Sequence, residues 1–279
     1  MVYDLPSELQ DAARHKLNET PETKTAALVA IRLKLLEMNY NPYRSDDDFL
    51  LRFLRQKKIR VTDAAESCRD YCNFLLENRI FFEGASWQET VAVFPTMGTM
   101  ILPHKDANGC YTNLVLPHKM RIDETDAQNP QEFGKRQLRA SLYLWELWLD
   151  DPHLQVHGVN VVQNFEGFSL SAMMTMQKVL TPDVQRLKMG FLKASPMRLA
   201  SICILEQPWY VTVMMSVVKP FLSSKLKKRI HTWGSDWHKL FAMHAPEQLP
   251  SEFHGTGLVK WDPQLEPRFS KDTRVIFPW

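Results

Sequence analysis

The chain has 279 residues, 44% of them hydrophobic, and its mean hydropathy of -0.30 is typical of a globular protein with a sizeable core. Its 34 Lys and Arg nearly balance 32 Asp and Glu, and this formal charge of +2 argues against nucleic acid as a partner. The first ten residues do not read as a signal peptide, and no apolar run reaches the roughly 18 residues of a membrane span. We therefore expect a cytoplasmic protein.

Residues 1–95 have a helical pattern. Leu28, Ile31 and Leu35 recur at helical spacing until Asn41-Pro42 ends the run. Ser45 is expected to cap the next helix, with Asp46 to Asp48 in its first turn, where negative charge is favourable.

A third helix is expected to run from a capping pair, Asp63 with Glu66, to about Asn78. No zinc-type or redox-type spacing occurs among the cysteines, which we expect to be reduced and mostly buried. They are Cys68, Cys72, Cys110 and Cys203.

After residue 95, short β-prone runs alternate with helical segments. The expected strands are 113–116, 159–162 and 202–205, and the expected helices are 131–149 and one or two within 169–193. This alternation predicts an α/β region with a mostly parallel sheet. The regions are therefore helical over 1–95, α/β over 96–260 and irregular over 261–279.

Signatures of common enzymes are missing. The chain has no dinucleotide-binding or phosphate-binding glycine loop, no HExxH and no GxSxG. Glu166 has no nucleophile nearby in sequence, and the pair His153 and His157 has no further metal ligand beside it. We expect no catalytic residue, no metal, no cofactor and no enzymatic activity.

Residues 208–218, PWYVTVMMSVV, are apolar on every side of a helix that is too short to span a bilayer. They form either a plain core helix or a lid over an apolar cavity. Residues 219–231 follow with five Lys or Arg and no acid, and Leu222, Leu226 and Ile230 form one stripe if this segment is helical. Basic residues beside an apolar element suit an anionic membrane surface and favour the lid.

A second apolar helix is expected around residues 136–151. Leu138, Leu142, Trp145 and Leu149 share one face with Ser141, and Glu146 interrupts the apolar residues elsewhere. Several methionines lie in the same half of the chain and suit an irregular apolar volume, whether core or ligand site.

Five segments in order resemble the CRAL-TRIO lipid-binding family. They are FLLRFLRQKK (49–58), GVNVVQNFEGF (158–168), ICILEQPWY (202–210), VVKPFLSSKLKKRIH (217–231) and LPSEFHGTG (249–257). The resemblance implies an N-terminal helical bundle and a sheet whose helix-covered face forms a lipid cavity, gated by a mobile helix that matches Pro208 to about Leu222.

The same resemblance implies two sets of site residues. The cavity positions are Leu138, Ser141, Trp145, Val159, Val161, Ile202, Ile204, Val211, Met214, Val217 and Phe221. The phosphoinositide-binding positions are Lys57, Arg198, Lys225 and Arg229. Ala200 replaces a further basic residue of the family pattern, Trp145 a small one and Gln163 an aromatic one, so the cavity of this chain should differ in shape and polarity.

These features predict a monomeric intracellular lipid-transfer protein. It would enclose a small hydrophobic ligand such as a retinoid, tocopherol or carotenoid and exchange it at anionic membranes by transient peripheral association, with phosphoinositide bound there. The alternative is a lipid-dependent sensor or adaptor that does not transport its ligand.

Overall fold

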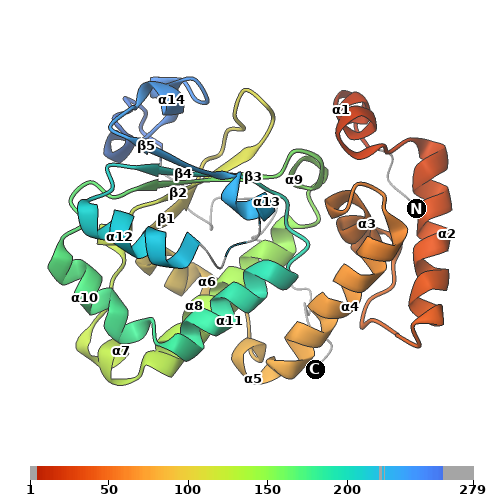
Figure 1. Ribbon diagram of the computed structural model, residues 1–279, viewed down its shortest axis with the longest axis horizontal. Coiled ribbons are helices and arrows are strands. Elements are labelled where there is room, and N and C mark those ends of the chain that lie inside the picture. The colour runs from red at the N-terminus through yellow and green to blue at the C-terminus, as the bar shows by residue number, and fades with distance from the viewer. Residues whose placement is uncertain (1–4, 220–221, 223, 260–279) are drawn as a thin grey trace.

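The computed structural model describes residues 5–219, 222 and 224–259. Helices of the N-terminal region lie beside a five-stranded sheet that has its own covering helices (Figure 1). The N-terminal helices are α1 (Ser7–Leu17), α2 (Pro21–Glu37), α3 (Asp47–Gln56), α4 (Val61–Glu77), α5 (Arg79–Phe82) and α6 (Trp87–Val93). The predicted tail, 261–279, lies outside the described residues.

The sheet has the strand order β1-β2-β3-β4-β5. Its strands are β1 (Thr99–Ile101), β2 (Tyr111–Val115), β3 (Val159–Asn164), β4 (Leu199–Leu205) and β5 (Ile230–Gly234). Only β1 pairs antiparallel, with β2, and the other pairings are parallel. The predicted mostly parallel α/β sheet is therefore confirmed.

Helical crossovers connect the parallel strands, as that pairing requires. They are α7 (Glu124–Gln128), α8 (Pro130–Trp148) and α9 (Pro152–His157) before β3, α10 (Leu170–Val179) and α11 (Pro182–Ala194) before β4, and α12 (Trp209–Val218) and α13 (Ser224–Lys227) before β5. Segment 169–193 forms two helices because Thr181 caps a new one, whose first position is Pro182. One further short helix is α14 (His238–Phe241). The single-turn 3-10 helices are Phe94–Thr96, Pro117–Lys119, Pro246–Gln248 and Ser251–Phe253.

The expected amphipathic stripe over 219–231 is wrong at its C-terminal end. Ile230 and His231 belong to β5, where they pair with Ile202 and Cys203 of β4. Strand pairing in the sheet overrides the local helical spacing, and α13 covers only Ser224–Lys227 in this part of the chain.

Two predicted helix caps also differ. Asp46, not Ser45, is the N-cap of α3, and its carboxylate accepts a hydrogen bond from the Phe49 amide at 3.0 Å. α4 begins earlier than expected and has no side-chain cap, so Asp63 lies within its first turn and pairs with Arg60 at 2.7 Å.

The Asp46 cap gives a pH-dependent prediction. Although burial raises the pKa of Asp46, hydrogen bonds from Arg44 and the Phe49 amide outweigh burial and lower it. A lowered carboxyl pKa stabilises the fold at neutral pH, and this contribution is lost as the pH falls below about 4 through the folded-state pKa.

We expect Asp46→Ala to lower the free energy of unfolding by about 1 kcal/mol at pH 7. Urea unfolding at several pH values should show the difference from wild type shrinking toward pH 3, and a constant difference would contradict the role of the charge.

One apolar core joins the N-terminal helices to the sheet region. Leu138 and Leu142 of α8 and Leu187 and Phe191 of α11 belong to the same buried cluster as the inner faces of α2, α3 and α4. Removing this surface from water contributes about 25 cal/mol per Å² of apolar area, so the two regions stabilise each other.

A buried ion-pair network crosses the same boundary. Arg52 of α3 donates to the carboxylates of Glu146 at 2.7 Å and Asp150 at 2.6 Å, and the Tyr71 hydroxyl also donates to Glu146. Burial lowers the pKa of Arg52, but the two carboxylates outweigh burial and raise it above its ordinary value. Glu146, which interrupts the apolar pattern of its helix, is thus the partner of a buried arginine.

Candidate functional site

The two faces of the sheet are packed differently. Asn160, Val162 and Asn164 of β3 are buried on one face. Val161 and Gln163, on the opposite face, are only partly buried although α8, α10, α11 and α12 lie on that side of the sheet (Figure 1). We call this opposite face the helix-side face; Ile202 of β4, which pairs with Val161, is also only partly buried there. The helix-side face is therefore less completely covered at these positions than the opposite face of the same strand.

An apolar cluster lies at one end of the helix-side face. Phe165, Phe168, Ile204 and Val211 are buried at its centre, which joins the strand ends to α10 and α12. The surrounding partly buried residues are Ala172, Met173, Met176, Ile202, Tyr210, Met215 and Ile230. We call these residues the gate cluster because α12 packs against the sheet through them.

The outer side of α12 is apolar and open to solvent. Trp209 is 72% exposed and Val213 is 54% exposed, one turn apart, while Val211 and Met215 face the gate cluster. Leu170 and Met174 are exposed at the same spacing on α10. Helices whose inner and outer sides are both apolar are typical of elements that meet a second apolar phase.

The predicted cavity residues lie in several places. Val161, Ile202 and Ile204 lie on the helix-side face, Val211 is in the gate cluster, and Met214 is 36% exposed. Leu138 is in the core shared with the N-terminal helices. Val159 is in a second buried cluster, with Tyr111 and Trp148, and Trp145 packs between the two. The Ser141 hydroxyl donates to the Gln137 carbonyl at 2.7 Å. The Val217 side chain and Phe221 lie outside the described part of the structure.

The predicted basic residues come together from distant parts of the chain. Burial lowers the pKa of Lys225, and the positive charges of Arg229, Lys57, Arg198 and Arg60, in that order, lower it further. This effect on Lys225 requires the four cations to lie near it. We call these five residues the basic cluster.

Arg198 has an unused hydrogen-bond donor. Burial and the neighbouring Arg229 lower its pKa, one of its terminal nitrogens donates to the Arg55 carbonyl at 3.1 Å, and its buried Nε has no partner among the described residues. A buried guanidinium with an unused donor is suited to an anion.

Arg60 is the member of the basic cluster that the sequence did not indicate. Lys58 and Ile59 have positive φ angles of 55° and 60°, and this tight turn after α3 brings Arg60 back toward Lys57. Two successive non-glycine residues in this region are unusual, and no local sequence signal predicts them. Arg60 also pairs with Asp63, so its charge is partly compensated.

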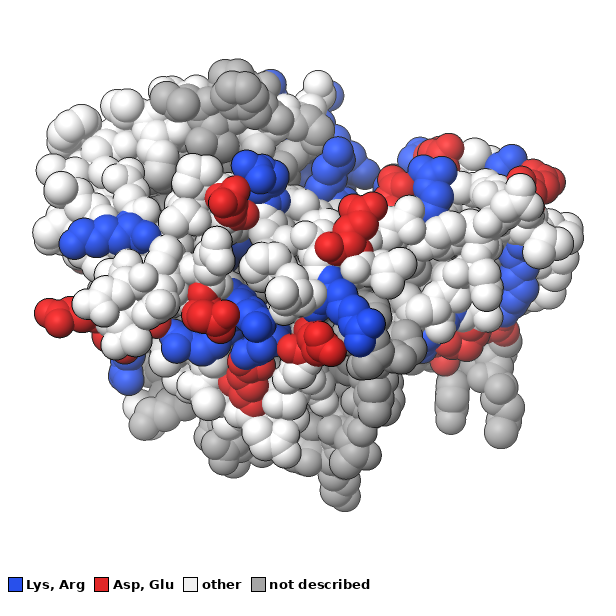
Figure 2. All heavy atoms as spheres, turned by 90° about the horizontal axis from the view of Figure 1, so that it is seen from below, with Lys and Arg blue, Asp and Glu red and all other residues white. Residues whose placement is uncertain are grey.

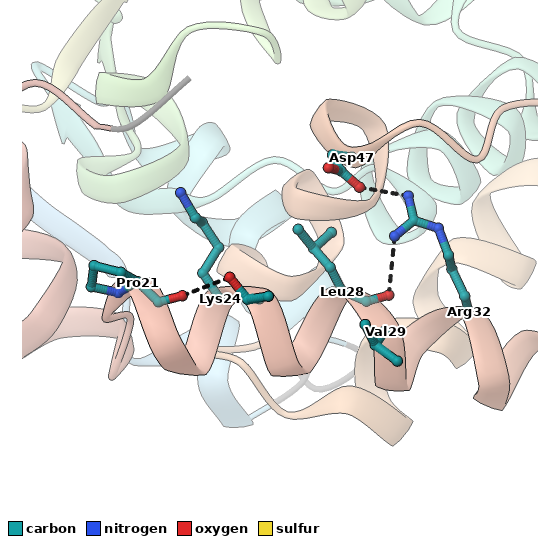
Figure 3. Close-up of a pocket in the computed structure, with 7 residues that line it drawn as sticks. Pro21, Lys24, Leu28, Val29, Arg32 and Asp47 are labelled. Atoms are coloured by element: carbon teal, nitrogen blue, oxygen red, sulfur yellow. Dashed lines mark hydrogen bonds and ion pairs between the residues drawn. The ribbon is translucent and has the colours of Figure 1, made fainter. Parts of the chain in front are cut away.

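One face of the molecule is electrically mixed. On the face seen from below, acidic and basic side chains are interspersed (Figure 2). A depression of about 280 Å³ on α2 is lined by Pro21, Lys24, Thr25, Leu28, Val29, Arg32 and Asp47 (Figure 3). Arg32 at its edge already pairs with Asp47 at 2.5 Å and donates to the Leu28 carbonyl, which leaves little there to bind a ligand.

Within residues 5–219, 222 and 224–259, no three metal-ligating side chains cluster. All four cysteines are buried and free, and burial raises the pKa of Cys110 to about 11. The Oε2 atom of Glu166 lies 3.1 Å from Nε2 of His254. In the same ranges no helix combines the length and apolarity needed to cross a bilayer.

The chain is similar to several known proteins. The chain is 29% identical to clavesin-1 of Pongo abelii over 260 residues, which are 90% of this chain and 69% of that protein. It is 29% identical to clavesin-2 of Homo sapiens over 259 residues, 90% of this chain and 75% of that protein. The crystal structure of Sfh5 aligns with a TM-score of 0.48 and 15% identity, covering 86% of this chain and 84% of the other. The pattern of the CRAL/TRIO domain matches residues 96–255. The chain belongs to the CRAL/TRIO family, whose members bind and transfer small lipophilic ligands.

Proposed function

We propose that this protein is an intracellular carrier that encloses one small hydrophobic lipid between the sheet and its helix layer and exchanges it at anionic membranes. The observation that carries the proposal is the partly buried helix-side face under α8, α10, α11 and α12. A ligand that filled this space would gain about 25 cal/mol per Å² of buried apolar surface. Retinoids, tocopherols and carotenoids have the apolar character that such a space requires.

In this proposal α12 is the gate. Its inner side completes the apolar wall through Val211 and Met215, and its outer side offers Trp209 and Val213 to the membrane. An indole ring is favourable at the level of the lipid head groups, where it is partly apolar and partly hydrated. Contact with lipid tails would compensate for the apolar contacts that α12 loses when it moves away from the sheet.

The basic cluster would hold the carrier at the membrane. Each cation near an anionic surface contributes about 1 kcal/mol, and several around one phosphate group form charge-assisted hydrogen bonds. Arg198, with its unused donor, and Arg229 would bind a phosphoinositide head group.

The outer side of α12 gives a direct prediction. We expect Trp209→Gln to weaken binding to anionic vesicles by about tenfold, because an indole in the membrane interface contributes about 1 to 3 kcal/mol. Vesicle sedimentation measures this change. The matched control is Leu36→Gln on α2, where an equally exposed leucine (74%) lies away from α12 and should have no effect. Equal losses in the two variants would contradict membrane contact through α12.

Transfer kinetics distinguish a carrier from a lipid-dependent sensor or adaptor. A carrier should move a fluorescent tocopherol or retinoid from donor to acceptor vesicles much faster than spontaneous exchange. A protein that binds the probe but leaves the exchange rate unchanged is a sensor, and that result would overturn the proposed transport. We further propose that the protein acts as a cytoplasmic monomer and has no enzymatic activity.

A further inference from the structure

Among the described residues, Lys188 of α11 carries a positive charge that has no counter-ion. It lies one turn after buried Val184 and next to buried Leu187; its side chain is partly exposed, and burial around its ammonium group is deep enough to lower the pKa. It forms no hydrogen bond or ion pair with any residue in the described ranges. Burial lowers its pKa, and no carboxylate among residues 5–219, 222 and 224–259 raises it. Buried ammonium groups are normally paired.

Contacts along α11 show where Lys188 points. A side chain at Gly190 would meet the Phe74 ring of α4 at 2.6 Å, whereas Val184 occupies the space beside Gly134 of α8. With about 3.6 residues per turn, Lys188 lies on nearly the same side of α11 as Val184, which contacts α8. Gly190, which faces α4, lies on the opposite side. α8 and α11 both lead toward the first residues of neighbouring parallel strands, so they run in the same direction. The sheet lies on a different side of α11 from α4 (Figure 1).

The facing part of α8 is also polar. Gln137, about one turn beyond Gly134, is 1% exposed, and its amide oxygen has no partner in the part of the chain that the structure describes. The Ser141 hydroxyl lies on the same side of α8, and Gln163 projects from the helix-side face of the sheet. The space between α8, α11 and the sheet therefore has a polar region with a cation in an otherwise apolar lining.

We propose that the lipid held in this space has a carboxylate head group, and that Lys188 binds it. This inference rests on the proposed carrier function and narrows its ligand class. An uncharged lipid would leave the ammonium group unpaired after water is displaced, which is unfavourable. A carboxylate would instead form a charge-assisted hydrogen bond, about twice as strong as one between neutral groups. The apolar chain would extend along the sheet toward the gate cluster.

The test compares two fluorescent probes that differ only at the head group, cis-parinaric acid and its methyl ester. Wild type is expected to bind the acid at least about tenfold more tightly than the ester, because a hydrogen bond between charged groups contributes about 1.5 to 3 kcal/mol. Lys188→Met, which keeps the length of the side chain, should remove this preference, and Lys188→Arg should retain most of it. Lys193→Met, at an exposed position of the same helix, is the matched control and should behave as wild type.

The possible outcomes separate the two proposals. If wild type and Lys188→Met bind both probes with the same acid-to-ester ratio, the role of Lys188 is wrong while the carrier function stands. If wild type takes up neither probe nor any lipid from vesicles, the carrier function itself fails. Thermal unfolding of each variant checks that it is folded, and removing an unpaired buried charge is expected to leave stability unchanged or raised.

Discussion

Replacing Arg52 with methionine should lower the free energy of unfolding by about 3 to 5 kcal/mol, because it leaves buried Glu146 without its cation. Both side chains are almost completely buried, at 1% and 2% exposed. Arg52 also donates to Asp150, and Tyr71 donates to Glu146. The loss of Arg52 therefore affects α3, α4 and α8 together. Urea unfolding followed by tryptophan fluorescence measures the change.

Two further variants test the cause of this loss. Arg69→Met removes a surface pair with Asp70, whose partners are 40% and 59% exposed, and should cost less than about 1 kcal/mol. Adding Glu146→Gln to Arg52→Met removes the uncompensated charge and should recover part of the stability. If Arg52→Met costs no more than Arg69→Met, the network does not join the two regions.

Neutralising Lys225 and Arg229 together should weaken binding to phosphoinositide-containing vesicles by about 100-fold, since each charge-assisted contact contributes about 1.5 to 3 kcal/mol. Both side chains lie in the basic cluster; Lys225 is exposed and Arg229 is partly buried, so Lys225→Gln with Arg229→Gln should fold normally. Affinity for the enclosed lipid should change less than about threefold, because neither residue is in the gate cluster.

The control for this double variant is Arg186→Gln. Arg186 is 78% exposed on α11 and pairs with Asp183, outside the basic cluster, so its loss should leave vesicle binding unchanged. Transfer to anionic acceptor vesicles should slow in the double variant and not in the control. An equal fall in lipid affinity and vesicle binding would contradict separate sites for the lipid and the head group.

Local sequence patterns were sufficient for the order of elements. Alternating β-prone and helical runs correctly predicted β2, β3 and β4 within a few residues and the crossover helices between them. They failed at residues 230 and 231, because pairing with β4 is a tertiary contact that helical spacing does not encode. The Asp46 cap was missed by one residue, a usual uncertainty at helix ends.

The candidate site was less predictable because it depends on contacts between distant residues. Arg60 joins the basic cluster through the positive φ angles of Lys58 and Ile59. Lys188 reads in the sequence as part of the solvated side of an amphipathic helix, and only the contacts of Gly190 and Val184 place it on the side of α11 that contacts α8. Glu146 appeared as an interruption until Arg52, 94 residues away, was found beside it.

The most direct test of the carrier function is the composition of the purified protein. We expect organic extraction of native protein, followed by mass spectrometry, to release one class of small hydrophobic lipid in a ratio near one per chain, with a carboxylate-bearing lipid most abundant. Finding no lipid in such an extract, together with no uptake from liposomes, would contradict the enclosed ligand on which the account depends.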